Sequence, residues 1–220
     1  MNQAMRNTND GISLLQVAEG ALVETQNAMQ RMRELAVQAN TATMTDTDKN
    51  ALQLEVTALM AEIERISTTT EFNGHSLING AFAGKKFQIG ANVGETLAVT
   101  IGSAQAQAIG LSGGGAYMSI GSGAANANLI EGVITRIDLA LDSVSDIRAN
   151  LGALQNRFES LIANVANVAE NTVGARSRIM DADIASETAN LTKNAIMQQA
   201  GTSILAQANQ QPQIALQLLG

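Results

Sequence analysis

The sequence predicts a mainly α-helical protein, an elongated antiparallel helical coiled-coil bundle with a small β-hairpin subdomain. The first observation behind this prediction is a long apolar heptad repeat in the second half of the chain. The second is a pair of shorter amphipathic stretches near the N-terminus, and the third is an alternating apolar and polar segment that follows them. Only 2% of the residues are aromatic, so the core must consist of aliphatic side chains packed in narrow helix seams.

The heptad repeat predicts one long helix over about residues 126–176. Apolar residues recur three and four positions apart over about six heptads, without a proline, which is typical of a coiled-coil seam. At about 1.5 Å per residue, roughly fifty residues make a rod of about 75 Å, so other segments must lie along it. The two seam positions are occupied by Ile130, Ile137, Val144, Leu151, Phe158 and Val165, and by Val133, Ala140, Ile147, Leu154, Leu161 and Val168.

Two shorter helices are predicted over about residues 10–40 and 47–67. The first follows capping residues at 8–11 and has an apolar face that Thr25 interrupts. The second begins at a capping box formed by Thr45 and Asp48. The two apolar faces consist of Leu15, Ala18, Leu22, Met29, Met32 and Ala36, and of Leu52, Val56, Leu59, Ile63 and Ile66.

The segment after the second helix changes from a helical to an alternating pattern. Two Asn-Gly pairs signal tight turns, and apolar residues alternate with polar ones on both sides of a glycine-containing loop. We therefore expect two short β-hairpins over about residues 72–101. The following stretch, about residues 112–125, is rich in Gly, Ser and Ala. It has little apolar surface, so a flexible loop is expected there.

The C-terminal stretch is predicted to be a separate segment, so that residues 1–183 form a core domain and residues 184–220 a terminal helix segment. No charged residue follows Lys193, although apolar residues continue. An exposed helix usually carries ion pairs, so this segment is expected to be covered by a partner. Isolated helices are marginal, and Gly201 and Pro212 weaken this one. We therefore expect the segment to be disordered without that partner.

Composition excludes several classes of function. The net charge of −7 argues against nucleic acid, whose phosphates require clustered Lys and Arg. No apolar run is long enough to span a bilayer, so membrane insertion is not expected. The first residues show no cleavable signal peptide. The chain has no cysteine, which excludes disulfides and thiolate metal sites.

No catalytic residue, cofactor site or metal site is predicted. His75 is the sole histidine, and its place after a turn glycine indicates a surface residue. The acidic residues Asp181, Asp183 and Glu187 are interpreted as a polar helix start or a family-specific contact rather than a cation site, because side chains two residues apart diverge on a helix. A further acidic stripe is interpreted as a solvated helix face. It consists of Asp138, Asp142 and Asp146.

Several ungapped sequence blocks resemble the bacterial flagellins, the subunits of the flagellar filament. They occur in family order over nearly the whole chain. The most specific blocks are NDGIS at 9–13, QRMRELAVQ at 30–38, EFNG at 71–74, QIGANVGET at 88–96, LGALQNRF at 151–158 and QQAGTS at 198–203. Flagellins usually have about fifty residues before the first block and often carry outer domains before the long helix. The resemblance therefore implies an N-terminally truncated, minimal flagellin.

The resemblance also implies a function, a location and partners. The chain would be a self-assembling filament subunit for motility, outside the cell, secreted by the flagellar type III export system. Its partners would be other copies of itself, the filament cap and hook-junction proteins, and an export chaperone that binds the C-terminal segment. The residues expected to contact the chaperone or the terminal helix are Ile196, Ile204, Leu205, Leu216, Leu218 and Leu219.

A receptor surface is implied as well. In flagellins, residues matching Arg31, Leu35, Gln38 and Glu55 lie on the surface recognised by the vertebrate flagellin-sensing Toll-like receptor, and the same face contacts neighbouring subunits. Arg31 and Glu55 are equidistant from residue 43, so an antiparallel helix pair would bring them to one level. Without the resemblance, this pair would be interpreted as an ordinary surface ion pair.

Two alternatives remain open. A hook-filament junction protein has a similar helical core, although the blocks at 30–38 and 207–213 favour a flagellin. A protease in the central region, known in some flagellins, would require two histidines in an H-E-x-x-H helix. His75 stands alone, so this alternative is disfavoured.

Overall fold

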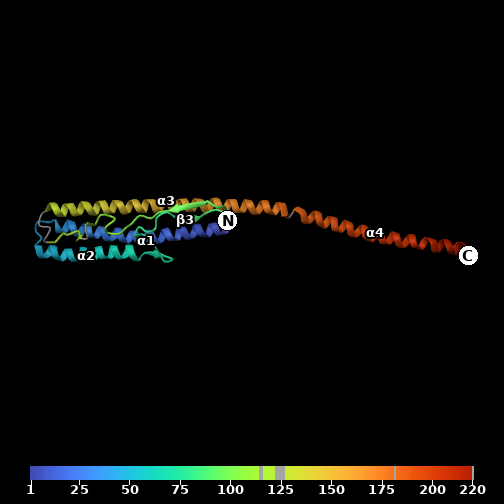
Figure 1. Ribbon diagram of the computed structural model, residues 1–220, viewed down its shortest axis with the longest axis horizontal. Helices are drawn as coiled ribbons and strands as arrows, with labels where there is room; N and C mark the ends of the chain where they lie inside the picture. The colour runs from blue at the N-terminus through green and yellow to red at the C-terminus, as the bar shows by residue number, and fades with distance from the viewer. Residues whose placement is uncertain (114–115, 122–126, 181, 220) are drawn as a thin grey trace. The chain divides into compact units, whose positions relative to one another are not determined.

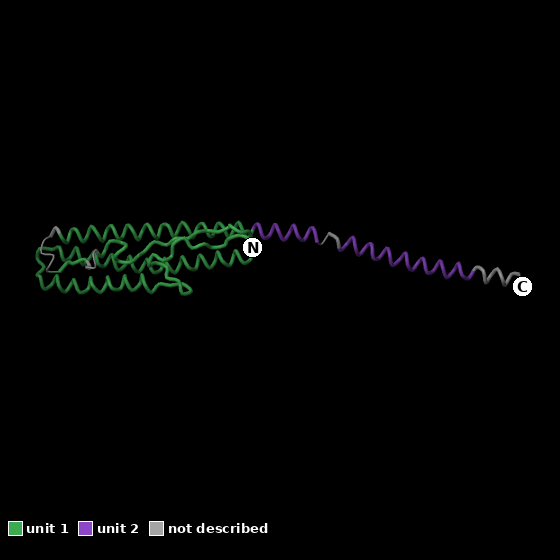
Figure 2. Tube along the Cα trace, in the orientation of Figure 1, with its two compact units in different colours: residues 1–166 green, residues 167–220 purple. Residues whose placement is uncertain are grey.

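A computed structural model gives the structure of residues 1–113, 116–121, 127–180 and 182–219, with backbone only for residues 113, 116–117, 127–128, 182–183 and 211–219. The chain divides into two compact units, residues 1–166 and residues 167–220 (Figure 2). The predicted mainly helical fold, with a long helix and small antiparallel sheets, is confirmed.

Three helices run side by side in the first unit: α1 (Asn2–Ala39), α2 (Asp46–Thr69) and the first part of α3 (Ala127–Met180). α1 is antiparallel to both others (Figure 1). The prediction that the first helix begins at about residue 10 is wrong, because its buried face continues toward the N-terminus. Ala4, Thr8 and Gly11 are all buried at helical spacing before Leu15.

The predicted α3 seam is confirmed over its first part. Five of its residues, at every seventh position, are at most 1% exposed: Ile130, Ile137, Val144, Leu151 and Phe158. The Phe158 ring packs edge-on against Phe87 with centroids 5.7 Å apart. It also fills the space beside Gly11, where an added Cβ would lie 2.9 Å from the ring. The aromatic side chains thus close the seam where α1, α3 and a hairpin meet.

The capping box at the start of α2 is confirmed. The Thr45 amide donates to Asp48 Oδ2 at 3.1 Å, and the Asp48 amide donates to Thr45 Oγ1 at 3.3 Å. The Thr45 hydroxyl also donates to Asp48 Oδ2, at 2.6 Å. This bond first, and then that of the Thr45 amide, lower the pKa of the Asp48 carboxyl. Val56, Met60 and Ile63 are buried on the face that packs toward α1.

The two predicted hairpins are present. β1 (Glu71–Phe72) pairs with β2 (His75–Ser76), and β3 (Lys85–Gln88) pairs with β4 (Thr96–Val99), both antiparallel. The first turn places Asn73 and Gly74 at φ 51° and 75°. Positive φ at both central residues is the conformation that an Asn-Gly pair favours.

The glycine-rich stretch is not simply a flexible loop, so that expectation is corrected for its described part. β5 (Ser112–Gly113) pairs with β6 (Ala116–Tyr117), and Met118 and Ile120 are buried in the core. The side-chain amide of Gln53 in α2 hydrogen-bonds this segment through both its nitrogen and its oxygen. Its Nε2 donates to Met118 O at 3.2 Å, and the Ile120 amide donates to Gln53 Oε1 at 2.6 Å. Two apolar side chains and one amide are thus enough to dock the segment.

The second unit contains the end of α3 and α4 (Ala182–Leu219). The expectation of disorder over residues 184–220 is wrong for this structure, in which the backbone is helical through Gly201 and Pro212. Ala, Gln and Leu predominate in α4, and all three favour helix. The described side chains of α4 are nonetheless almost all exposed. No helix among the described residues is long and apolar enough to cross a membrane.

Candidate interaction surfaces

The predicted Arg31 and Glu55 pair is formed on the exposed face shared by α1 and α2. Arg31 Nε donates to Glu55 Oε1 at 2.8 Å, and its Nη1 donates to Glu34 Oε2 at 3.1 Å. The hydrogen bond to Glu55 first, and then that to Glu34, raise the pKa of the Arg31 guanidinium. All three residues and Gln38 are exposed, so this face is polar and open.

Leu35 does not belong to this exposed face, which corrects the expectation from the sequence. Its side chain is 1% exposed and packs in the hydrophobic core. Leu35 lies three residues after Met32 and directly before Ala36, which are both fully buried. A helix has about 3.6 residues per turn, so Leu35, four residues after Arg31, is rotated about 40° around the helix axis from it. This rotation places Leu35 on the inner side of α1. The surface that the free chain presents therefore consists of Arg31, Gln38 and Glu55.

A groove follows the same α1–α2 boundary toward the end of α2, and sequence reasoning missed it. Its lining includes the small residues Gly20, Ala21 and Ala28. Because Gly20 has no side chain and nothing lies within 4 Å of the Cβ position, the α1 backbone is accessible there. A glycine in mid-helix costs about 1 kcal/mol relative to alanine, and no packing inside the chain accounts for it.

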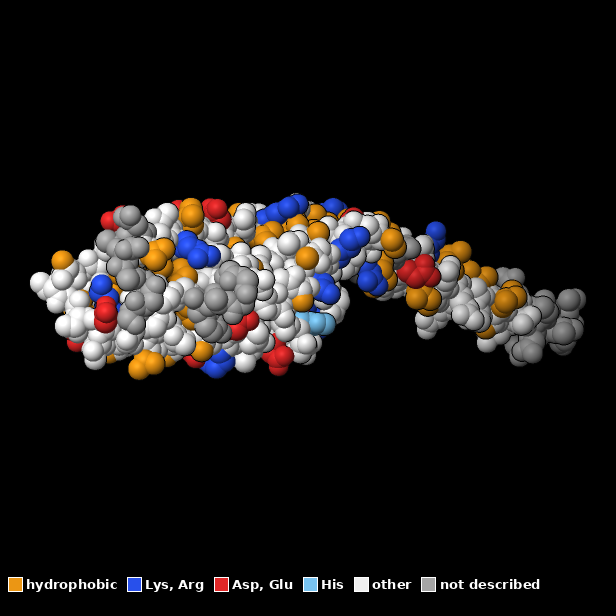
Figure 3. Space-filling view, turned by 60° about the vertical axis from the view of Figure 1, so that its left-hand side comes forward, with side chains coloured by type: hydrophobic (Ala, Val, Ile, Leu, Met, Phe, Trp, Pro, Cys, Tyr) orange, Lys and Arg blue, Asp and Glu red, His pale blue; other side chains and the backbone are white. Residues whose placement is uncertain are grey.

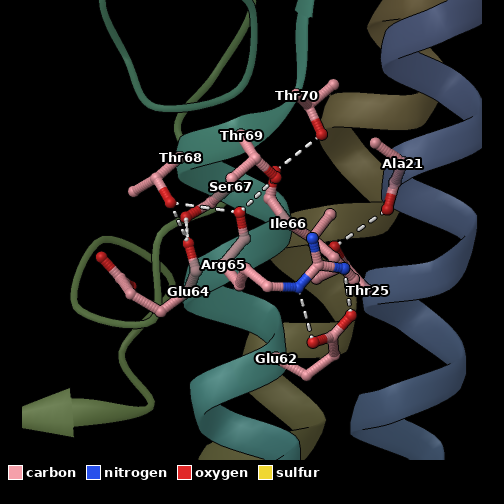
Figure 4. Close-up of polar contacts among 10 residues, drawn as sticks. All are labelled: Ala21, Thr25, Glu62, Glu64, Arg65, Ile66, Ser67, Thr68, Thr69 and Thr70. Carbon is pink, nitrogen blue, oxygen red and sulfur yellow. Dashed lines mark hydrogen bonds and ion pairs between the residues drawn. The ribbon is translucent and has the colours of Figure 1, made fainter.

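The end of α2 beside this groove is held by local hydrogen bonds (Figure 4). Arg65 binds Glu62 through both Nε and Nη2, at 2.8 and 2.5 Å. These bonds raise the pKa of Arg65 and lower that of Glu62. Thr69 and Thr70 donate to the carbonyl oxygens of Arg65 and Ile66. The hydroxyl groups satisfy carbonyls that the helix end leaves free.

Polar contacts also fix α1 against α3. Arg148 Nε donates to Glu19 Oε1 at 2.7 Å, and Arg148 also hydrogen-bonds Gln26. Arg33 Nε donates to Asp138 Oδ1 at 2.6 Å. Asp138 of the predicted acidic stripe thus pairs with α1, while its side chain stays 46% exposed. The other two members, Asp142 and Asp146, are exposed.

His75 is exposed, as predicted, and lies at the edge of a hollow between α1 and the hairpins. The side chains of Phe72, Phe82 and Phe87 line this hollow, together with Lys85 and Lys86. Among the described residues, no group of three His, Asp or Glu side chains is placed to hold a metal ion. Asp181 and the side chain of Asp183 lie outside the described residues.

α4 carries several exposed apolar side chains, from Ile184 at 66% to Leu205 at 64% exposed. In the space-filling view, hydrophobic side chains follow its length (Figure 3). Of the predicted contact residues, Ile196, Ile204 and Leu205 are 62%, 66% and 64% exposed. The side chains of Leu216, Leu218 and Leu219 lie outside the described residues. No charged residue follows Lys193, so no ion pair can form between side chains of the later part of α4.

Seams of aliphatic residues, hairpins docked against them and a long uncovered helix define a helical structural protein whose surfaces suit contact with other proteins. Comparison with known families makes this class specific. Residues 1–83 match the bacterial flagellin N-terminal helical region, and residues 134–219 match the bacterial flagellin C-terminal helical region. The chain belongs to the family of bacterial flagellins, as the sequence resemblance predicted.

Similar proteins and structures agree with this assignment. Flagellin from Halalkalibacterium halodurans is 43% identical over 219 residues, which cover 100% of this chain and 78% of that protein. A flagellar filament 30.7 kDa core protein from Treponema maltophilum is 41% identical over 230 residues, covering 100% and 79%. The crystal structure of Bacillus cereus flagellin has 30% identity and a TM-score of 0.59, covering 78% of this chain and 94% of that one.

A hook-associated protein shares the fold. The structure of a putative flagellar hook-associated protein from Vibrio parahaemolyticus has a TM-score of 0.62 at 16% identity, covering 80% of this chain and 88% of that one. At this identity the likeness concerns the fold alone. The family matches therefore favour a flagellin over the hook-junction alternative.

Proposed function

We propose that this chain is a structural subunit of the bacterial flagellar filament, outside the cell, that assembles with copies of itself. The observation that carries the proposal is the long α4 surface, which is apolar, uncharged after Lys193 and uncovered. Exposed apolar area of this extent is typical of surfaces that another protein covers. Family membership gives the kind of assembly, since a relative is named as a filament core protein.

Incorporation into filaments tests this proposal. Labelled chain is mixed with monomeric Bacillus subtilis flagellin, which is 42% identical to it, and the mixture is polymerised and pelleted. We expect the label to enter the pelleted filaments. A matched control chain that ends at residue 183 should enter poorly, because it lacks α4. Exclusion of the complete chain from well-formed filaments would refute the proposal.

We propose further that α4 is the binding segment for a flagellin export chaperone before assembly. Ile196, Ile204 and Leu205 are exposed along one helix. At about 3.6 residues per turn, Leu205 lies on the side opposite Ile196. A groove that accepts a helix face would therefore cover Ile196 with Ile204, and Leu205 would need a second contact. Calorimetric titration with a flagellin chaperone compares the complete chain with the chain ending at residue 183. Equal affinities would place the chaperone site elsewhere. Secretion by the flagellar type III system, without a cleaved signal, belongs to the same proposal.

The face formed by Arg31, Gln38 and Glu55 is proposed as a surface for the vertebrate flagellin-sensing Toll-like receptor. Its support is the family resemblance of these residues and their exposure. An exposed arginine that anchors an interface can contribute about 2 kcal/mol or more. Receptor-driven reporter signalling of Arg31→Ala at unchanged melting temperature is the test. Signalling equal to that of wild type would reject this surface. Contacts with the filament cap and hook-junction proteins remain a proposal from the family alone.

A further inference from the structure

The hollow between α1 and the hairpins is apolar inside and basic at its edge. Phe72, Phe82 and Phe87 are three of the four phenylalanines in the chain. Lys85 and Lys86 stand beside them, are exposed and form no ion pair within the described residues. Asp10 of α1 also lines the hollow, so the two lysines exceed the acidic side chains there by one charge. The chain has a net charge of −7, so a basic, ring-lined hollow is unusual on this surface.

The exposed side of α3 has the opposite character. Leu139 is 61% exposed, and Asp142 and Asp146 follow it at intervals of three and four residues, also exposed. Residues at this spacing share one helix face. Neither aspartate takes part in an ion pair among the described residues, in contrast to Asp138. This face therefore offers one apolar side chain followed by two free carboxylates.

The two surfaces are complementary in both charge and polarity, and both belong to the first unit. A leucine suits a hollow lined by phenylalanine rings, and two carboxylates suit two free lysines at its edge. Because the surfaces are different patches of one chain, a contact between two copies would be heterologous. A heterologous contact that does not close into a ring extends into a helical filament.

We propose that the hollow beside Lys85 and Lys86 receives the face of α3 that carries Leu139, Asp142 and Asp146 from a second copy of this chain. This inference rests on the proposed function as a filament subunit and names the surfaces that two copies would join. The lysine and aspartate charges set the register of the contact, and the leucine supplies its apolar centre.

Charge reversal tests the pairing. The variant K85E/K86E alone should associate with itself about tenfold more weakly than wild type, because like charges then meet at the contact. The variant D142K/D146K alone should show the same loss. An equimolar mixture of the two should recover association, since each hollow then finds a complementary face. Lys49→Glu, a single reversal at the start of α2, is the control and should change little.

Single cysteines test the geometry, because the chain has none of its own. Ala83→Cys beside the hollow and Ser143→Cys on the α3 face both alter exposed residues. With a short bis-maleimide crosslinker, mixed dimers of the two variants should exceed either homodimer several-fold. Ala51→Cys on α2 is the control and should crosslink to neither. Circular dichroism confirms that each variant remains folded.

The outcomes separate this inference from the proposed function. If wild-type chain enters flagellin filaments but the charge-reversed mixture recovers nothing, the pairing is wrong and the filament role stands. Homodimers that match or exceed mixed dimers would also overturn the pairing. If wild-type chain neither enters filaments nor associates with itself, the proposed function falls first. Rescue by the mixture together with mixed dimers establishes the pairing.

Discussion

The two units of this flagellin use helices of similar sequence character in opposite ways. In residues 1–166 the positions of α3 at every seventh residue of the seam are covered, from Ile130 at 1% to Phe158 at 0% exposed. In residues 167–220 apolar positions continue, yet Val173 and Ile184 are 67% and 66% exposed. The difference shows that an apolar repeat predicts a face that needs a partner. It does not show whether the same chain supplies that partner.

Removing the aromatic closure of the first unit should have the largest effect. Phe158→Ala should lower the free energy of unfolding of residues 1–166 by about 3–5 kcal/mol, since it empties a fully buried site between α1, α3 and β3. Val173→Ala, a truncation on the exposed part of α3, is the control and should change it by less than about 0.5 kcal/mol. Urea unfolding followed by circular dichroism measures both. Similar losses in the two variants would contradict the contrast between the units.

Leu35→Ala should be the next largest change. It removes a buried leucine and should cost about 2–5 kcal/mol. Arg31→Ala, one turn earlier, removes an exposed ion pair that contributes little to stability, and should leave the melting temperature almost unchanged. Thermal melting of the two variants gives the comparison. A small loss for Leu35→Ala would mean that Leu35 is a surface residue after all, as the sequence alone suggested.

Glycine replacements sharpen the comparison at an intermediate size. Gly152 and Gly201 lie in α3 and α4, and an added Cβ meets nothing within 4 Å at either. Each change to alanine should favour its helix by about 1 kcal/mol. Gly152→Ala should raise the melting temperature of the first unit. Gly201→Ala should slow amide hydrogen exchange in α4 only, because α4 belongs to the second unit. A rise in global melting temperature for Gly201→Ala would show that α4 is coupled to the core.

The smallest effect concerns pH. In the loop between β3 and β4, the Asn92 amide and side chain donate to Glu95 at 2.9 and 2.8 Å and lower the pKa of its carboxyl. A lowered folded-state pKa stabilises the fold above the unfolded-state pKa, and this contribution is lost as pH falls through the folded value. Acidification from pH 6 to below about pH 4 should therefore lower the melting temperature of wild type slightly more than that of Glu95→Gln. Parallel slopes would exclude a role for this loop.

Much of the fold could be predicted because periodicity reports faces directly. The α3 seam, the capping box at Thr45 and the Asn73-Gly74 hairpin depend on local patterns. Their structures agree with those patterns. The start of α1 was missed because Thr8 and Gly11 are not apolar, although both are buried. Thr8 achieves this by donating its hydroxyl to Ala4 O at 2.7 Å.

The candidate surfaces were harder to predict than the elements. Arg31 and Glu55 are equally far in sequence from residue 43, in the connection between α1 and α2. An antiparallel helix pair brings such positions to the same level, so the prediction that they lie side by side is confirmed. The burial of Leu35 depends on helix rotation, which a count of turns does not resolve. The docking of residues 118–120 depends on Gln53, an amide with no apolar pattern. The ring-lined hollow requires α1 and the two hairpins to meet, and no local pattern in the sequence predicts that meeting.

The sequence separations of the polar contacts of α1 predict an order of folding. Arg31 reaches Glu55 across 24 residues, whereas Arg33 and Glu19 reach Asp138 and Arg148 across 105 and 129. Closing a longer loop costs more entropy before any contact rewards it. The α1–α2 hairpin should therefore form first, with the apolar face that α3 covers still exposed. Docking of α3 should then limit the folding rate. Until then the inner face of α1 is bare, and a newly made chain is most prone to aggregate during that interval.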